Sequence, residues 1–369
     1  MDNCVIPHGY KATALGIIPQ EWEVMLLGNL SNSISSGRNK HRDAHGQYPV
    51  FGSTGIIGYS STYEYEGPVI LVARVGANAG TLNFASGQYD VSDNTLIITI
   101  KQNVYDYNFA YNQLTHYKLN KLVFGSGQPL ITSKQLKNIR IPVPPLAEQR
   151  KIAEVLGVWD KAIEKQARLI EKLALRKRAL MQRLLSAKLR LPGFSEPWKK
   201  VKLGDVAELY QPQTIQSEDL SQTGYPVYGA NGLIGYYNNY NHEYPQVVIT
   251  CRGSSCGTVN FTPGKCWITG NAMVLNVDNN RDVNKSFFYY LISNSSFVNL
   301  ISGSGQPQIV RQPLLKFELR IPPLKEQTAI AEVLTAADRE IDLAKEKLER
   351  LRRQKRGLMQ QLLTASFTG

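Results

Sequence analysis

The stretch IPVPPLAEQRKIAEVL, residues 141–156, returns later in the chain as IPPLKEQTAIAEVL, residues 321–334. Proline suits the first turn of a helix, and Glu148 follows Pro145 in that turn, where the helix dipole favours an acid. The run after Pro145 continues to Leu191-Pro192-Gly193, a typical helix stop. The two copies therefore predict two long helices of similar sequence.

Apolar side chains in both helices recur at alternating steps of four and three residues, which is the pattern of a coiled-coil seam. We expect the seam to contain Ile152, Leu156, Trp159, Ile163, Ile170 and Leu173 in the first helix, and Ile330, Leu334, Ile341, Leu348 and Leu351 in the second. A lysine occupies the same seam position in each helix, Lys177 and Lys355. It either fixes the register of the pair or snorkels out to solvent.

Other strings recur at nearly the same distance, so the whole chain is an internal repeat. YPVFGSTGIIGY at 48–59 returns as YPVYGANGLIGY at 225–236, and GSGQP at 125–129 returns at 303–307. Ahead of each long helix lies a segment rich in Gly, Asn, Ser, Thr and Tyr. Its short β-branched runs, such as 69–74 and 95–100, predict strands. We expect helices at residues 109–119 and 283–300.

The expected fold class is α+β, with two mixed α/β-rich globular heads separated by two long helices. The first helix leads from head one to head two and the second ends the chain, so a paired arrangement must be an antiparallel coiled coil with a pseudo-twofold axis. We expect head one at residues 1–145, the first helix at 146–190, head two at 191–320 and the second helix at 321–369.

The chain of 369 residues has a net charge of +12, which makes an acidic partner such as nucleic acid worth testing. The two heads carry only +2 and +1, whereas the first helix carries +7 and the second +2. The excess on the first helix indicates either a solvated helix face or attraction to phosphates. The sequence has no run of about 18 apolar residues, so we expect no membrane span. The first residues do not have the pattern of a secretion signal. The four cysteines form no CxxC pair, so reduced thiols in the cytoplasm are expected.

The repeated PLAEQRKIAEVL and PLKEQTAIAEVL, the repeated GSGQP and the order head, helix, head, helix resemble type I restriction-modification specificity subunits over essentially the whole chain. The resemblance implies that each head is a target recognition domain for one half of a bipartite, asymmetric double-stranded DNA site. It implies that the helices set the spacer and dock methyltransferase subunits, typically two per chain. It further implies that restriction and translocase subunits join through that complex, which would methylate adenine N6 and cleave DNA with ATP.

The chain itself shows no motif for that chemistry. It contains neither the [DN]PP[YF] sequence of amino-methyltransferases nor a GxxxxGK[ST] phosphate loop, and its histidines show no metal-ligand spacing. We therefore expect a non-catalytic subunit with no cofactor and no metal. Three alternatives stay open: the recognition subunit of a related two-subunit enzyme, a protein scaffold with no DNA role, and an autonomous enzyme.

Sequence readout requires hydrogen-bonding side chains on loops that a rigid scaffold holds. The candidates in head one are Arg38, Asn39, Lys40, His41, Arg42, Ser53, Thr54, Arg74, Ser92, Asn94, Ser126, Gln128 and Lys134. The counterparts in head two, with Arg252 matching Arg74, are Asn231, Arg252, Ser254, Thr269, Asn271, Ser304, Gln306 and Arg311.

Base-reading residues should differ between heads that read different bases. This favours the run 38–42 and the unmatched segment 211–223. The invariant GSGQP indicates a structural turn or contact with the DNA backbone.

Overall fold

The computed structural model describes residues 6–40, 43, 45–125, 129–229, 232–303 and 305–364. The chain divides into two compact units, Met1–Ala167 with Glu346–Gly369 and Arg168–Lys345. Each unit combines one head with a segment of each long helix. We call them unit 1 and unit 2.

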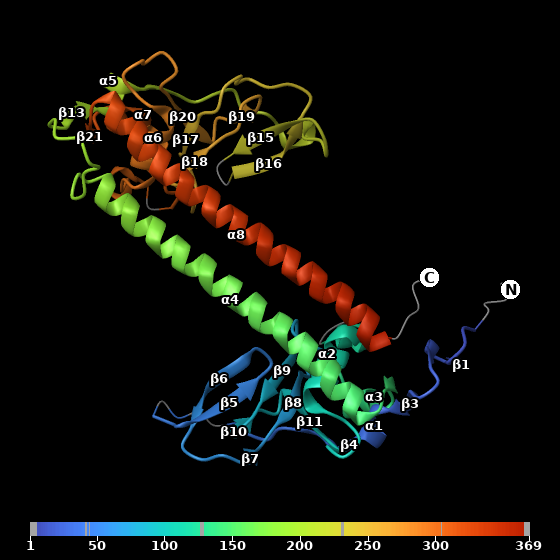
Figure 1. Ribbon diagram of the computed structural model, residues 1–369. Coiled ribbons are helices and arrows are strands. Elements are labelled where there is room, and N and C mark those ends of the chain that lie inside the picture. The colour runs from blue at the N-terminus through green and yellow to red at the C-terminus, as the bar shows by residue number, and fades with distance from the viewer. Residues whose placement is uncertain are drawn as a thin grey trace. The chain divides into compact units, whose positions relative to one another are not determined.

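Head one contains two four-stranded sheets (Figure 1). The first has the order β4(Ser31–Ser36), β11(Thr95–Ile100), β8(Val69–Ala73) and β9(Leu82–Ala85), with all neighbours antiparallel. The second has the order β6(Gly55–Ser60), β5(Tyr48–Gly52), β10(Gln88–Val91) and β7(Tyr65–Glu66), in which β5 and β10 are parallel. Strands β8 and β11 are the predicted β-branched runs, and their side chains are almost all buried.

Smaller elements complete head one and connect it to the long helix. Hairpin β1(Tyr10–Thr13)–β2(Gly16–Pro19) comes first, and β3(Glu23–Leu26) pairs with β12(Arg140–Val143) just before the helix. The helices of the head are α1(Leu27–Leu30), α2(Tyr107–Tyr117), η1(Leu119–Leu122) and α3(Ser133–Lys137).

Head two repeats this plan, and several of its strands are shorter. One sheet has the order β14(Glu208–Tyr210), β20(Ala272–Asn276), β17(Val247–Thr250) and β18(Val259–Phe261), and the other β16(Gly232–Tyr237), β15(Tyr225–Gly229) and β19(Trp267–Ile268). Strand β13(Lys199–Lys202) pairs with β21(Glu318–Ile321), as β3 pairs with β12. The helices are α5(Leu203–Val206), η2(Ser217–Asp219), α6(Lys285–Ser293), η3(Val298–Leu300) and α7(Arg311–Leu315).

The two predicted long helices are α4(Leu146–Leu184) and α8(Leu324–Thr364). Helix α4 ends before the Leu191-Pro192-Gly193 stop signal. Ala187 adopts φ 59°, and the Leu189 amide donates to the Arg183 carbonyl at 3.0 Å, which closes the last turn. The seam residues named above are all buried or half-buried. The expected fold class, two β-rich heads with two paired long helices, is confirmed.

The seam lysines form equivalent ion pairs in the two units. In unit 1, Lys355 Nζ lies 2.6 Å from Asp160 Oδ1, and in unit 2, Lys177 contacts Asp338. Lysine and aspartate each recur 178 residues apart, so one interaction is present twice. Both lysine side chains are less than one-fifth exposed. Of the two alternatives for these lysines, the structure therefore favours register fixing over snorkelling.

Within each unit the helix segments run antiparallel. In unit 2, Arg176 pairs with Glu340 and Lys177 pairs with Asp338. Residue numbers therefore increase along α4 in the direction in which they decrease along α8. In unit 1, Met359 and Leu363 of α8 belong to the hydrophobic core of head one. In unit 2, Leu184 and Leu185 of α4 belong to the core of head two. Each head is therefore packed against both helices.

The repeated glutamine of the EQ sequence fixes the start of each long helix. Gln149 is completely buried, and its Nε2 donates to the carbonyls of Val104 and Pro144 at 2.9 Å while its Oε1 accepts from the Asp106 amide at 2.9 Å. Gln327 makes the same three bonds in unit 2 with the backbones of Asp282, Pro322 and Asn284. The motif that defines the repeat thus joins a head loop to its helix.

In the described part of the chain, no helix has both the length and the apolar character that a membrane span requires.

Candidate DNA-reading edge of each head

Backbone hydrogen bonds bring several candidate loops of head one to one edge. The Asn39 amide donates to the Val91 carbonyl, and the Ser92 amide to the Phe51 carbonyl. On the other side, the Arg74 amide donates to the Asn94 carbonyl at 2.9 Å. These contacts place loops 37–40, 52–54, 92–94 and 74–76 side by side. We call this set the reading edge of head one.

The GSGQP loop joins this edge through its proline. The Gly76 amide donates to the Pro129 carbonyl at 3.0 Å, and Phe124 and Leu130 form a β-bridge that closes the loop. Gly125 has φ 99° and its equivalent Gly303 has φ 90°, a conformation that favours glycine. The first glycine of each repeated GSGQP string thus adopts a turn conformation, and contact of the string with the DNA backbone stays a prediction.

Head two builds the same edge from equivalent residues. The Thr269 amide donates to the carbonyl of Tyr228. The Cys251 amide donates to the carbonyl of Asn271, and the Gly253 amide to that of Pro307. Segment 211–214 takes the place of loop 37–40, because Gln211 Nε2 donates to the Gly270 carbonyl at 3.0 Å. The unmatched segment therefore begins at the reading edge of head two.

The equivalence between the heads differs at one position from the sequence alignment. The sequence predicts Arg74 and Arg252 as counterparts, but the bridges Val75–Leu130 and Arg252–Gln308 make Arg252 equivalent to Val75. Cys251, which is buried, occupies the place of Arg74. Because successive residues of an extended chain point to opposite sides, the two heads present their arginines on opposite sides of this loop.

The remaining candidates divide by exposure. Arg38, Lys40, Thr54, Asn94, Lys134, Arg252, Ser254 and Asn271 are exposed. Ser92 and Thr269 are buried at equivalent positions of the two edges. Asn39 is held by the Asp90 carboxylate. Arg311 Nε donates to the Leu209 carbonyl at 2.7 Å, which ties it to β14.

Several candidates lie outside the described residues: His41, Arg42, Ser126, Gln128, Asn231 and Ser304. Ser53 is half-buried in the turn between β5 and β6, and Gln306 is an exposed residue of the GSGQP turn.

The sequence interpretation missed an exposed apolar hairpin that both heads share. Ile56 and Ile57 of β6 are 53% and 38% exposed, and the equivalent Leu233 and Ile234 are 50% and 45% exposed. The apolar pair recurs in the repeated GIIGY and GLIGY strings, but the sequence alone does not show that these side chains are exposed. This hairpin adjoins the reading edge through β5.

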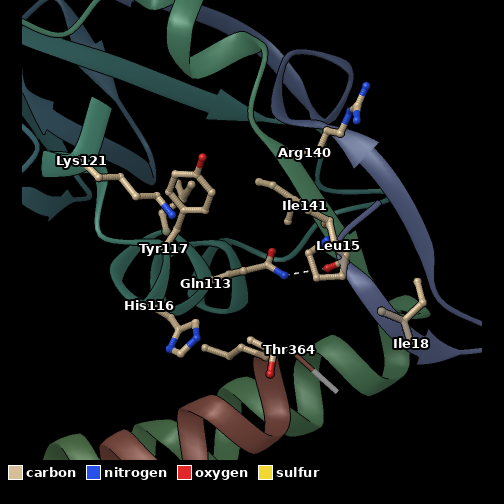
Figure 2. Close-up of a pocket in the computed structure, with 12 residues that line it drawn as sticks. Leu15, Ile18, Gln113, His116, Tyr117, Lys121, Arg140, Ile141 and Thr364 are labelled. Carbon is tan, nitrogen blue, oxygen red and sulfur yellow. Dashed lines mark hydrogen bonds between the residues drawn. The ribbon is translucent and has the colours of Figure 1, made fainter. Parts of the chain in front are cut away.

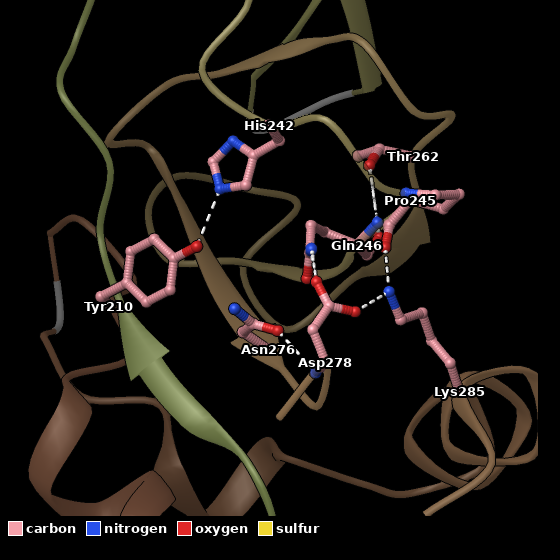
Figure 3. A network of polar contacts seen from close by, with 8 residues as sticks. All are labelled: Tyr210, His242, Pro245, Gln246, Thr262, Asn276, Asp278 and Lys285. Carbon is pink, nitrogen blue, oxygen red and sulfur yellow. Dashed lines mark hydrogen bonds and ion pairs between the residues drawn. The ribbon is translucent and has the colours of Figure 1, made fainter. Parts of the chain in front are cut away.

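A partly buried polar network in head two includes Tyr210, the residue before Gln211 (Figure 3). Tyr210 and His242 are hydrogen-bonded through the phenol oxygen and Nε2 at 2.9 Å, and His242 Nδ1 lies 2.6 Å from Asn241 Oδ1. Nearby, Asp278 accepts from Gln246 Nε2 at 2.7 Å and pairs with Lys285. Burial lowers the pKa of His242, and it raises the pKa of Tyr210.

This network predicts a pH dependence of the stability of unit 2. Since the pKa of His242 is lower in the folded state, the unfolded state binds more protons below its ordinary pKa near 6.5. Stability should be complete above that pH and fall as the pH drops through the folded pKa. His242→Gln should flatten this dependence in exchange-protected amides of unit 2. His116→Gln, which removes a histidine of lowered pKa from unit 1, is the control and should leave unit 2 unchanged.

No group of three or more His, Cys, Asp or Glu that suits a metal ion occurs among the described residues. Cys251, Cys256 and Cys266 are free thiols.

The family model for the type I restriction modification DNA specificity domain matches residues 19–174 and again residues 195–353. The chain belongs to this family. As such it is a DNA specificity subunit, a non-catalytic component of a type I restriction-modification system, which confirms the expected role and the resemblance.

Two of the proteins to which this chain is similar align with it over nearly its full length. The chain is 24% identical to the type I restriction enzyme MjaVIII specificity subunit of Methanocaldococcus jannaschii, over 95% of this chain and 94% of the relative. The fold matches the type I S subunit of M. genitalium with a TM-score of 0.65 and 20% identity, covering 93% of this chain and 96% of the other. It also matches a chain from a study of complex assembly in the type I system, with a TM-score of 0.57 and 19% identity over 94% and 98% of the two chains.

Proposed function

We propose that this specificity subunit reads a bipartite, asymmetric DNA site, one half through the reading edge of each head. The observation that carries the proposal is the presence of two edges with the same backbone framework and different side chains. Arg74 and Val75 in head one correspond to Cys251 and Arg252 in head two. Because the two edges share a backbone framework, both heads would dock on DNA in the same way. Because their side chains differ, the two heads would read different half-sites.

The near-neutral heads suit readout by hydrogen bonds, with general phosphate attraction supplied by other parts of the complex. Exposed basic residues on α4, including Lys172 and Arg178, are candidates for that attraction. We retain 1–145 and 191–320 as the recognition domains and 146–190 and 321–369 as the spacer helices. The same proposal places the subunit in the cytoplasm with its DNA.

Selection of random duplexes by the purified complex tests bipartite reading. We expect enrichment of two short, different sequence blocks at a fixed separation, with affinity that falls as salt rises. A single continuous block, or a palindrome, would contradict the assignment of one half-site to each head. No enrichment at all would favour the scaffold alternative.

We further propose that two methyltransferase subunits dock on each chain, at equivalent grooves beside the long helices. The groove in unit 1 has about 690 Å³ and is lined by Asp106, Asn108, Ala153, Glu154, Gly157 and Lys161, among others. The groove in unit 2 has about 460 Å³, and its lining includes Asn284, Ser286, Ala331, Glu332, Thr335 and Arg339. Each member of the second set lies 178 residues after a member of the first. Restriction and translocase subunits would then join through the methyltransferases.

Charge reversal in the grooves should change the number of bound methyltransferase subunits. Glu154→Lys and Glu332→Lys should each leave a complex with one methyltransferase, and the double variant should leave none, as measured by native mass spectrometry. Glu171→Lys, at an exposed position of α4 outside both grooves, is the matched control and should keep two. Retention of two subunits by the double variant would place docking elsewhere.

A further inference from the structure

Unit 1 contains a pocket that the proposed function does not use. It has a volume of about 280 Å³ and lies among the end of α2, strand β12, the β1–β2 hairpin and the end of α8 (Figure 2). The amide of Gln113 is already engaged there, because its Nε2 donates to the Pro142 carbonyl at 2.6 Å. The apolar walls include Leu15, Leu114, Ile141 and Leu363. All of the lining residues belong to the described part of unit 1.

The lining contains three basic side chains, His116, Lys121 and Arg140, and among its described residues there is no Asp or Glu. Lys121 Nζ lies 3.5 Å from the centroid of the Tyr117 ring, which holds its charge at the wall, and Arg140 is exposed at the rim. Burial, and after it the charges of Lys118 and Lys121, lower the pKa of His116. Positive potential therefore collects at this wall, which favours an anion.

Unit 2 keeps the apolar walls and lacks the basic groups. Leu114, Ile141 and Leu363 have aliphatic equivalents, at a shift of 178 residues, in the core of unit 2. At the same shift, the three basic positions hold two asparagines and a glutamate, which are Asn294, Asn299 and Glu318. The architecture that the two units share therefore does not require the basic groups, and they are available for a role specific to unit 1.

We propose that this pocket binds a small organic anion in which a carboxylate is joined to an apolar body, such as an aliphatic or aromatic monocarboxylate. The apolar body lies against Leu114, Ile141 and Leu363, and the carboxylate accepts hydrogen bonds from Lys121 and His116. An apolar cavity of about 150 Å³ is sufficient to hold benzene, so about 280 Å³ has room for a body of this kind. The proposal is independent of how the heads read DNA.

Titration of the full chain with octanoate, followed by methyl NMR, tests the proposal. Signals of Leu114, Ile141 and Leu363 should shift. Octanoate should bind about 10-fold or more tightly than octan-1-ol, because only the anion can form charge-assisted hydrogen bonds with the wall. Octylamine, which carries a positive charge on the same chain, should bind more weakly than either. Equal affinity for octanoate and octan-1-ol, shifts confined to other parts of the chain, or no binding would overturn the proposal.

Exchange of the basic residues for their unit 2 counterparts tests the role of the wall. The double variant His116→Asn, Lys121→Asn should lose about 10-fold or more in affinity for octanoate and keep its affinity for octan-1-ol, a pattern that unfolding would not produce. Lys101→Asn, at an exposed position of unit 1 outside the pocket, is the control and should bind octanoate as the wild type does. Unchanged octanoate affinity in the double variant would show that these groups do not hold the carboxylate.

Discussion

Replacing Gln149 with alanine is expected to lower the free energy of unfolding of unit 1 by about 3 kcal/mol or more. The substitution removes three hydrogen bonds and leaves the Asp106 amide and the carbonyls of Val104 and Pro144 without that partner. Each unsatisfied buried group costs about 1–3 kcal/mol. Gln327→Ala should have the same effect on unit 2, because it makes the equivalent bonds.

Hydrogen exchange measured by mass spectrometry separates the two units. Amides of α2 should lose protection in Gln149→Ala and amides of α6 in Gln327→Ala, each with little change in the other unit. The controls are Gln354→Ala in unit 1 and Gln182→Ala in unit 2, which alter exposed glutamines of the long helices. If the buried and exposed substitutions cost the same, the repeated glutamine does not fix the start of the helix.

The second large effect is expected from the triple variant Arg38→Ala, Lys40→Ala and Arg42→Ala. Arg38 and Lys40 are exposed beside the reading edge of head one, whereas Arg42 lies outside the described residues. A good side-chain contact to a base discriminates by about 1–3 kcal/mol. The variant should therefore lose about 100-fold or more in affinity for one half-site, with recognition of the other half unchanged.

Competition with duplexes altered in one half-site measures that loss. The control replaces Arg350, Arg353 and Arg356, three exposed residues of α8, with glutamine. If these helix residues contribute only general attraction to phosphates, their loss weakens all duplexes alike and reduces the salt dependence. Equal loss at both half-sites in the head-one variant, or no loss, would rule out the run 38–42 as the reader of one half-site.

The repeat made the fold predictable from the sequence. Seam positions such as Leu156 and Leu334 identified both long helices, and chain connectivity fixed their antiparallel direction. The end of α4 was predicted too late, because the left-handed conformation of Ala187 gives no sequence signal as strong as Pro192-Gly193.

The candidate site was predictable only in part. Proximity of loops 37–40, 92–94 and 74–76 depends on strand pairing between distant segments, which the sequence alone does not specify. The pairing of Arg74 with Arg252 was wrong because identical residue types aligned while the β-bridges are shifted by one position. Gln149 and Gln327 were visible as repeated letters, but their burial depends on carbonyls that only the folded head brings near.

The central claim is that this chain determines which DNA sequence its methyltransferase modifies. The most direct measurement is to express the chain with its methyltransferase in a host without adenine methylation and to map modified adenines across the genome by single-molecule sequencing. We predict a split, asymmetric motif with a fixed gap, which disappears when this chain is omitted. An active methyltransferase in a soluble complex that modifies no such motif, or that modifies the same motif without this chain, would contradict the account.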